Sequence, residues 1–470
     1  MRSRSLGGLL LLHLLVALAG CDGGGGDPAD ASSVDAGAAL DAGATPEDAG
    51  ATPEDAGSAP ADAGAPDAGC APEADAVLCA AASAECGEVR ATDRCGAERT
   101  ARCGGCLATE TCGLDVANRC ANAGFVITTI DGDGDVGQEV SLAIDADDVL
   151  HVAYRRDGGG ISGDLRYARS SASGWVTETI DDDVIAGRHT AIAIDGAGVV
   201  HVAAPAGSTT PSRAIDLWTR GASGWSLTMI PGASVGRLDL AFDASARAHL
   251  CAYRAPSGGF GGFLSHFAQG SDGTFGASTI DGTIASASSR VGDYCSIAFD
   301  GATARASYYD GQFMRLKHAV RAGASWTPEV VDAPAGDGAG DYASMALDAT
   351  GAPVIAYRFG ALSRREIRVA RPGAAGWTLV TVDADAGTIA NHTAIALDAS
   401  GRAHVTYFDS RAPGTLRYAS ETASGFTLAD VAVVGTGSGG HSAIALDSAG
   451  AVHIVYYDVT TSSLRHASPR

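Results

Sequence analysis

The chain has 470 residues and a formal net charge of −23 at pH 7. About half of this excess lies in residues 22–69, which contain eleven acidic residues and no basic residue. Because the remaining chain is also mildly acidic, the charge argues against nucleic acid as a partner.

Residues 1–20 are predicted to be a secretory signal. Arg2 and Arg4 give a positive start, and the apolar run from Leu9 to Ala19 is too short to anchor stably across a bilayer. The run ends in Leu18-Ala19-Gly20-Cys21, which resembles the lipobox of bacterial lipoproteins. The resemblance implies a lipid on Cys21, with the membrane as a partner and the bacterial cell envelope (outer membrane, cell surface or periplasmic side) as the location. The alternative is an ordinary signal peptide with an incidental cysteine.

Residues 21–69 are predicted to be a disordered linker. The segment repeats Ala, Asp, Gly and Pro and offers only one valine and one leucine as larger apolar residues, so it cannot form a core. Its like charges favour an extended chain. We expect it to hold the folded parts away from the membrane.

Residues 70–120 are predicted to be a small disulfide-rich module. Eight of the eleven cysteines lie in this stretch, and an even count in an exported protein favours four bridges. The pairing stays open, because eight cysteines allow about 105 connectivities. The spacing resembles a Cys-rich module of secreted proteins in some high-GC bacteria, a resemblance that implies no activity. The eight are Cys70, Cys79, Cys86, Cys95, Cys103, Cys106, Cys112 and Cys120.

Residues 121–470 consist of repeats with a spacing of 48–57 residues, which is the period of a β-propeller blade. Each unit offers up to four short β-type runs separated by turn residues, without helical periodicity. We therefore predict an all-β, seven-bladed propeller. Seven aspartates mark the units: Asp145, Asp195, Asp243, Asp300, Asp348, Asp398 and Asp447.

The two ends of the repeat region predict how the ring closes. The seventh unit ends at Arg470 before its fourth strand, whereas residues 124–131 match the fourth strand of the first unit, residues 174–181. An N-terminal strand that completes the last blade would remove the exposed sheet edges. We expect a closed ring and a monomer.

The repeat also carries a family resemblance. Ala-Ile-Ala-Leu-Asp447-Ser-Ala-Gly-Ala-Val-His453-Ile-Val-Tyr456 is similar to an NHL-type blade and, more loosely, to the Asp-box of sialidase-like propellers. An Asp-box has a tighter Asp-x-Gly spacing followed by an aromatic residue, whereas Asp-x-x-Gly here leads to histidine. The resemblance implies the architecture and not sialidase chemistry.

Residues shared by most blades are interpreted as structural. A histidine follows the repeat aspartate by six residues in five units, where the aspartate caps a turn and the histidine packs and hydrogen-bonds. The informative position lies six residues before the aspartate, at the predicted channel mouth, because its residue differs between blades. It holds Glu139, His189, Arg237, Tyr294, Tyr342, His392 and His441, which we take as candidate ligand-binding residues.

Part of this ring has the residue types of a metal site. Blades 6, 7, 1 and 2 are consecutive and present His392, His441, Glu139 and His189, which suit one divalent metal such as zinc or calcium. On the other side, Arg237, Tyr294 and Tyr342 suit an anionic or hydroxylated ligand. The alternative is that these are ordinary polar residues at loop–strand junctions.

Two further features allow two interpretations each. Asp131-Gly-Asp133-Gly-Asp135 resembles the start of a calcium loop, but Leu142 stands where the closing glutamate is needed, so solvated acidic turns are favoured. Cys251 and Cys295 stand at similar heights in blades 3 and 4, where they form either an inter-blade disulfide or two buried thiols.

The sequence predicts a lipid-anchored binding or adhesion scaffold that presents the propeller to a glycan, peptide or protein. The alternative is a metal-dependent lyase or hydrolase at the channel mouth. No nucleophile motif, phosphate loop or paired-carboxylate signature is present, so no catalytic residue is assigned.

Overall fold

The computed structural model describes residues 70–84, 86–104, 110–113, 118, 120–122, 124–159, 162–182, 189–206, 213–232, 235–255, 261–283, 290–360, 365–384, 391–436 and 441–470. The predicted signal, the Cys21 lipid site and the linker lie outside these ranges. None of the helices within them is long and apolar enough to cross a membrane.

Within the described residues, three disulfides hold the N-terminal module together, and they give the pairing of six of its eight cysteines. They join Cys70 to Cys95, Cys79 to Cys103 and Cys86 to Cys112. Cys106 and the side chain of Cys120, the two remaining cysteines, lie outside the described part. The module's elements are α1 (Asp75–Ala81), β1 (Glu88–Thr92), β2 (Glu98–Arg102), β3 (Glu110–Cys112) and β4 (Cys120–Asn122).

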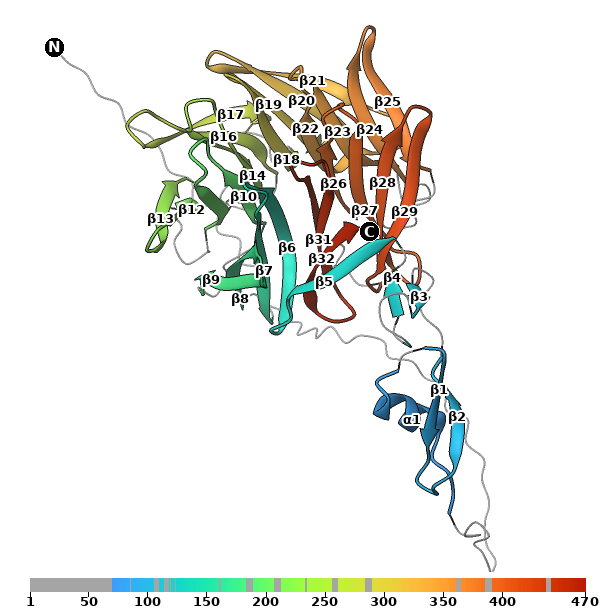
Figure 1. The fold of residues 1–470 in the computed structure, drawn as a ribbon. Coiled ribbons are helices and arrows are strands. Elements are labelled where there is room, and N and C mark those ends of the chain that lie inside the picture. The colour runs from blue at the N-terminus through green and yellow to red at the C-terminus, as the bar shows by residue number, and fades with distance from the viewer. Residues whose placement is uncertain are drawn as a thin grey trace, which may run out of the picture. The chain divides into compact units, whose positions relative to one another are not determined.

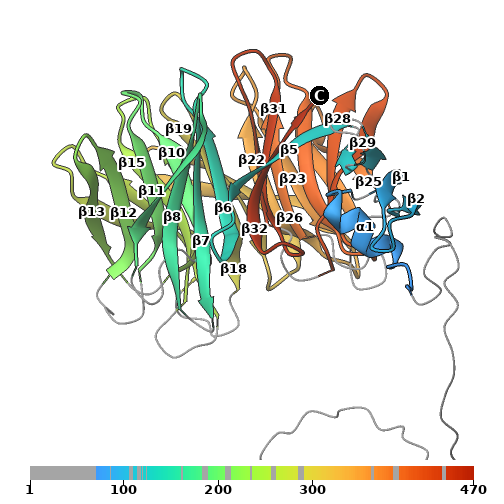
Figure 2. The same cartoon turned by 60° about the horizontal axis from the view of Figure 1, so that its bottom comes forward.

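Seven four-stranded antiparallel sheets follow in the described part of the chain, which confirms the seven-bladed propeller (Figure 1, Figure 2). The first three blades are β6 (Asp135–Ile144), β7 (Leu150–Gly159), β8 (Ser162–Ser171) and β9 (Gly174–Asp181); β10 (Ala191–Ile194), β11 (Val200–Pro205), β12 (Arg213–Gly221) and β13 (Gly224–Pro231); and β14 (Val235–Phe242), β15 (Ala248–Arg254), β16 (Phe263–Gln269) and β17 (Phe275–Asp281). The next three are β18 (Val291–Asp300), β19 (Thr303–Asp310), β20 (Arg315–Ala322) and β21 (Ser325–Asp332); β22 (Ala339–Leu347), β23 (Pro353–Phe359), β24 (Glu366–Gly373) and β25 (Gly376–Asp383); and β26 (Asn391–Leu397), β27 (Ala403–Asp409), β28 (Thr415–Thr422) and β29 (Gly425–Val433).

The seventh blade is completed by the N-terminal strand, as predicted. It consists of β30 (Ser442–Leu446), β31 (Val452–Asp458), β32 (Ser463–Pro469) and β5 (Phe125–Asp131). Strand β5 pairs antiparallel with β32, with Ile127 opposite Ala467, and Figure 1 shows it beside the red C-terminal strands. The innermost strands contact one another in sequence around the ring, and β30 contacts β6. The ring is therefore closed.

The core lies between consecutive blades. Alternating strand residues put one set of side chains on each sheet face, where they pack against the next blade. One buried cluster joins Ile215 and Leu217 of blade 2 to Leu240 and Leu250 of blade 3. At the closing point, Val152 of blade 1 packs with Leu464 of blade 7 in the same way. Burial of such side chains stabilises each blade interface by about 1.5–3 kcal/mol per residue.

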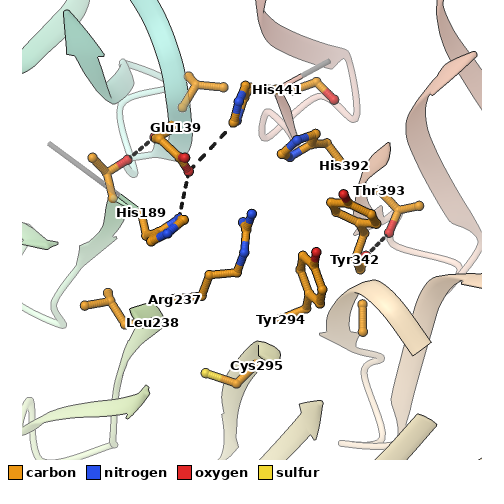
Figure 3. Close-up of a pocket in the computed structure, with 14 residues that line it drawn as sticks. Glu139, His189, Arg237, Leu238, Tyr294, Cys295, Tyr342, His392, Thr393 and His441 are labelled. Carbon is orange, nitrogen blue, oxygen red and sulfur yellow. Dashed lines mark hydrogen bonds and ion pairs between the residues drawn. The ribbon is translucent and has the colours of Figure 1, made fainter. Parts of the chain in front are cut away.

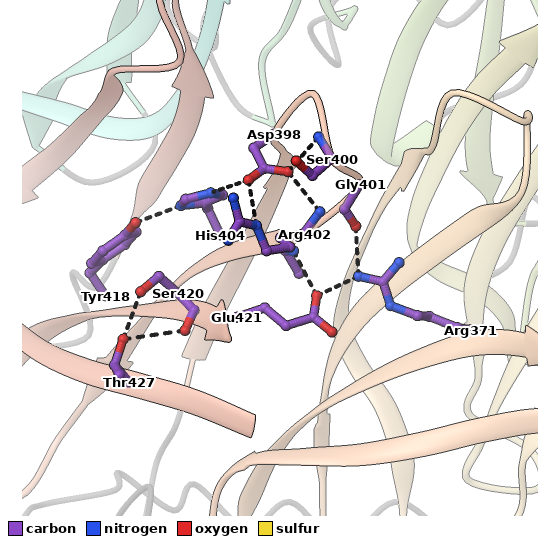
Figure 4. Close-up of polar contacts among 11 residues, drawn as sticks. Arg371, Asp398, Ser400, Gly401, Arg402, His404, Tyr418, Ser420, Glu421 and Thr427 are labelled. Atoms are coloured by element: carbon purple, nitrogen blue, oxygen red, sulfur yellow. Dashed lines mark hydrogen bonds and ion pairs between the residues drawn. The ribbon is translucent and has the colours of Figure 1, made fainter. Parts of the chain in front are cut away.

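The turns between the first two strands explain the shared Asp and His residues. In blade 1, Asp145 Oδ1 accepts hydrogen bonds from the backbone N–H groups of Asp147 and Val149, both at 2.9 Å. His151 joins Asp145 Oδ2 through Nε2 at 3.0 Å and the Tyr167 hydroxyl through Nδ1 at 2.6 Å. Figure 4 shows the equivalent contacts of Asp398, His404 and Tyr418 in blade 6. The same turn contact recurs at Asp195, Asp243, Asp348, Asp398 and Asp447, which confirms the structural interpretation for these turns.

The acidic residues between blades 7 and 1 are also hydrogen-bonded within the fold. Asp131 accepts a hydrogen bond from the Tyr154 hydroxyl at 2.6 Å and pairs with Arg166 at 3.4 Å. Asp135 accepts one from Tyr457 at 2.5 Å. Two of the three carboxylates of the calcium-like sequence are thus occupied by protein donors.

Cys251 and Cys295 form the inter-blade disulfide that the sequence allowed. Cys251 lies on β15 of blade 3 and Cys295 on β18 of blade 4, and both are buried. The bridge anchors β18 at Cys295, which directly follows the channel residue Tyr294.

Candidate functional site

A β-bulge in the innermost strand turns one side chain of each bulged blade into the channel. In blade 4, Asp293 pairs with Tyr309 and Ser296 with Ser307, so Tyr294 and Cys295 together face the single residue Tyr308. The same shift of register occurs at Glu139, Tyr342 and His392. Bulges of this kind re-aim side chains and often lie next to functional sites.

The backbone at this position is held in a left-handed conformation that residues other than glycine rarely adopt. Five of the seven channel residues have φ between 51° and 55°, at a cost of roughly 1–2 kcal/mol each. Two residues earlier, Gly292 and Gly340 also have positive φ, and a Cβ there would lie 2.6 Å and 2.8 Å from the preceding blade. Because this backbone strain recurs at the equivalent position of five blades, it points to a functional site there. The five are Glu139, His189, Tyr294, Tyr342 and His392.

All seven predicted channel residues line one pocket of about 160 Å³. Figure 3 shows their side chains around a common opening. The structure thus brings together Glu139, His189, Arg237, Tyr294, Tyr342, His392 and His441. Their binding of a ligand stays a prediction.

Glu139 is the anionic member of the ring and is already paired. Its carboxylate lies 3.0 Å from His189 Nδ1 and 3.9 Å from His441 Nδ1. Burial opposes its ionisation, but the hydrogen bond from His189 and the charges of His441, His189 and Arg237 together hold the pKa of Glu139 well below its usual range. Glu139 is therefore a carboxylate at neutral pH, hydrogen-bonded to His189.

Aromatic and imidazole rings form the opposite arc. The ring centres are 4.4 Å apart for Tyr294 and Tyr342, 5.1 Å for Tyr342 and His392, and 4.0 Å for His392 and His441. Burial lowers the pKa of His392 and of His441. Both imidazoles are therefore neutral at pH 7, and the arc offers apolar ring faces with a few polar edges.

Arg237 reaches into the middle of the pocket (Figure 3). Its guanidinium carbon lies 4.6 Å from the centre of the Tyr294 ring. Among the residues that the structure describes, none forms a hydrogen bond or an ion pair with its side chain. A guanidinium with free N–H groups is suited to a planar or tetrahedral oxyanion, which it can bind through two parallel hydrogen bonds.

The four residues with metal-ligand side chains lie in the same arc, but their contacts are with one another. His189 and His441 direct Nδ1 to Glu139, and the ring of His392 packs at a tilt against that of His441. Within the described ranges, no group of three or more His, Cys, Asp or Glu side chains could hold a metal ion as placed. A zinc or calcium site formed by His392, His441, Glu139 and His189 stays a prediction.

Two positioning residues escaped the sequence analysis. Thr190 Oγ1 donates a hydrogen bond to the carbonyl of Glu139, and Thr393 Oγ1 donates one to the carbonyl of Tyr342. Each hydroxyl thereby ties the bulge of the preceding blade to the start of the inner strand of its own blade. The available signal was a hydroxyl residue directly after His189, His392 and His441.

No protein-family model matches this chain, and no curated protein matches it. Similar solved structures exist. A PL25 ulvan lyase bound to -[GlcA(1-4)Rha3S]- has a TM-score of 0.53 at 11% identity, and the match covers 72% of this chain and 95% of that one. A second structure of a PL25 ulvan lyase gives 0.53 at 12% identity with the same coverage. The polysaccharide lyase Uly1 gives 0.47 at 11%, covering 74% and 91%. At these identities, the likeness shows the fold alone.

Proposed function

We propose that the channel mouth binds an acidic saccharide and that Arg237 holds its carboxylate or sulfate group. The observation that carries this proposal is the guanidinium of Arg237, which stands inside the pocket without a hydrogen bond or a close ion pair among the described residues. Guanidinium N–H groups left without acceptors in a partly enclosed site are costly, unless a ligand supplies the acceptors.

The other channel residues suit the remainder of a sugar. Tyr294 and Tyr342 offer ring faces for its C–H groups and hydroxyls for its oxygens, while the neutral His392 and His441 accept or donate hydrogen bonds. The pocket of about 160 Å³ is smaller than the roughly 300–1,000 Å³ of sites for drug-sized ligands. We therefore expect it to hold one acidic sugar unit.

The fold likeness supports the same class of ligand. The similar ulvan lyase was solved with a saccharide that contains a uronate and a sulfated rhamnose. The disulfides favour an oxidising compartment outside the cytoplasm. Together with the Cys21 lipobox and the 21–69 linker, they support a binding scaffold tethered to the bacterial cell envelope.

The test uses the full-length protein and a panel of oligouronates, sulfated oligosaccharides and neutral oligosaccharides. Wild type should bind acidic members, and Arg237→Ala should weaken this binding by about 10-fold to 100-fold, as expected for a lost hydrogen bond to a charged group. Arg247→Ala is the matched control, because Arg247 also belongs to blade 3 but is paired with Asp243. Binding of neutral members alone, or equal binding by Arg237→Ala, would contradict the proposal.

A second candidate is β-elimination of a uronate, favoured by the neutral imidazoles and phenols next to Arg237. A base in the ring would remove the C5 proton while Arg237 neutralises the adjacent carboxylate. The electron pair would form the C4–C5 double bond, and the glycosidic oxygen would leave C4 with a proton from a tyrosine.

Ultraviolet absorbance of the unsaturated product is the readout for this elimination. If no bound oligouronate gives this absorbance, binding remains as the function. Metal analysis of wild type and His441→Ala tests the metal-dependent form of this alternative.

A further inference from the structure

A second pocket lies in the groove between blades 4 and 5, away from the channel. It has a volume of about 390 Å³, and its lining includes Arg305, His318, Glu329, Pro353 and Trp377, which we call the inter-blade groove. Pro353 follows the turn after β22, whereas the channel residue Tyr342 stands near the start of that strand. The inter-blade groove and the channel mouth are therefore at opposite ends of β22.

Other blades show how the polar groups at this level are normally paired. In blade 3, His249 Nδ1 lies 2.9 Å from His266 Nε2, and in blade 7, His453 Nδ1 lies 3.0 Å from His466 Nε2. In blade 6, a tyrosine replaces the second histidine and its hydroxyl contacts His404 (Figure 4). In these blades, the histidine of the second strand thus forms a hydrogen bond with the polar side chain of the third strand.

Blade 4 breaks this pattern. Arg305 stands where the second-strand histidine would be, opposite Val320 of β20. His318 is 1% exposed, and its Nδ1 lies 2.9 Å from Glu329 Oε1, but its Nε2 has no hydrogen-bond partner among the described residues. Within the same residues, the buried Nε of Arg305 has none either. A buried polar atom without a partner is unfavourable, and here two such atoms belong to residues that line one pocket.

The free atoms differ in character. A carboxylate such as Glu329 can only accept, so the His318 proton is on Nδ1 and its Nε2 is a hydrogen-bond acceptor. Arg305 can only donate. A hydroxyl group can serve either atom, and Trp377, in the wall of the pocket, offers an aromatic surface for C–H groups. The charges of Arg305 and Glu329 balance, so a charged ligand gains no net attraction.

We propose that the inter-blade groove is a second binding site, for a neutral sugar unit. One ligand hydroxyl donates to His318 Nε2, another accepts from Arg305, and the sugar ring packs on Trp377. The site is independent of Arg237 and of the acidic ligand at the channel. A protein with both sites can hold two chemically different parts of a glycan surface.

Saturation-transfer NMR on the full-length protein tests this site, with methyl glycosides of glucose, galactose and mannose as probes. At least one probe should receive saturation from wild type and from Arg237→Ala, and Arg305→Ala and Trp377→Ala should weaken its binding about tenfold or more. Trp225→Ala is the matched control, since Trp225 occupies the same place in blade 2 but donates to Glu178 at 3.0 Å.

Arg305→His restores the pairing seen in blade 3, so it should raise the melting temperature and abolish probe binding. This pair of effects separates a ligand site from a structural irregularity. A pocket that holds only water would give no saturation transfer to any probe, and that result would overturn the proposal. Unchanged probe binding in both Arg305→Ala and Arg305→His would overturn it equally.

Discussion

The guanidinium of Arg237 lies over the ring of Tyr294 in a cation–π contact, with 4.6 Å between the guanidinium carbon and the ring centre. The two residues come from neighbouring blades, and both lie at the level where bulges open the inner strands. A cation–π contact holds the guanidinium in place and leaves its N–H groups available. This relationship is the structural basis of the oxyanion site that we propose at the channel mouth.

The left-handed backbone at His189 predicts that function and stability oppose each other there. His189→Gly should leave the free energy of unfolding unchanged or raise it by about 1 kcal/mol, because glycine adopts φ near 51° without strain. The same change should weaken saccharide binding, since the His189–Glu139 contact is lost. Thermal unfolding and titration calorimetry measure the two effects.

Ala246 supplies the control for this experiment. It has φ of 55° in a turn between β14 and β15, and it does not line the channel pocket. Ala246→Gly should stabilise the protein to a similar degree and leave binding unchanged. A stability loss of several kcal/mol in His189→Gly would instead mean that this residue serves the fold.

Buried neutral histidines predict that the fold is weakened by acid. Burial and the neighbouring His453 lower the pKa of His466 to about 4, from 6.5. The pKa of His466 is lower in the folded chain than in the unfolded chain, so the unfolded chain takes up the proton first as the pH falls. The free energy of unfolding is therefore highest above pH 6.5 and decreases by up to about 3 kcal/mol as the pH falls towards about 4. The melting temperature should therefore drop across this interval.

His466→Tyr tests the origin of this drop, because Tyr167 in blade 1 and Tyr418 in blade 6 occupy the position equivalent to His466. The variant should match wild type at pH 8 and lose less stability between pH 6.5 and 4. Identical pH dependence in the two proteins would assign the acid sensitivity to other groups.

The Cys251–Cys295 bridge predicts a link between stability and binding. Replacing both cysteines by alanine should cost about 2–5 kcal/mol of unfolding free energy. Because Cys295 directly follows Tyr294 and lines the same pocket, saccharide binding should weaken as well. Calorimetry of the double variant measures the first effect, and a melting temperature equal to that of wild type would contradict it.

Ring closure predicts that β5 is essential for folding. A chain that lacks residues 1–131 loses Phe125 and Ile130, which are 3% and 6% exposed, and leaves the edge of β32 unpaired. It should aggregate or unfold without a cooperative transition. A chain that lacks only residues 1–69 is the control and should melt like the full-length protein. Equal melting of the two shortened chains would refute this role of β5.

The architecture was predictable because each blade repeats the same local signals. The aspartate that marks each repeat and the match of residues 124–131 to residues 174–181 place all seven blades and the closing strand. Counting back from each aspartate also located the channel residues. These features depend on short-range spacing, which a sequence shows directly.

The remaining features depend on contacts between segments far apart in the chain. The bulges at Glu139 and Tyr342 arise where two inner-strand residues face one buried tyrosine of the next strand. The lack of a hydrogen-bond partner for Arg237 and for His318 Nε2, within the described residues, becomes visible only when neighbouring blades are in place. The pairing of Cys70 with Cys95 was likewise one possibility among many.

The most direct test of the proposed function is calorimetric titration of wild type and Arg237→Ala with an oligogalacturonate, a sulfated oligosaccharide and their methyl-esterified or desulfated counterparts. The account predicts that wild type binds at least one acidic form, at least tenfold more tightly than its neutral counterpart, and that Arg237→Ala loses this preference. Equal affinity for the charged and neutral forms, or an unchanged preference in Arg237→Ala, would show that Arg237 does not form an acidic-saccharide site.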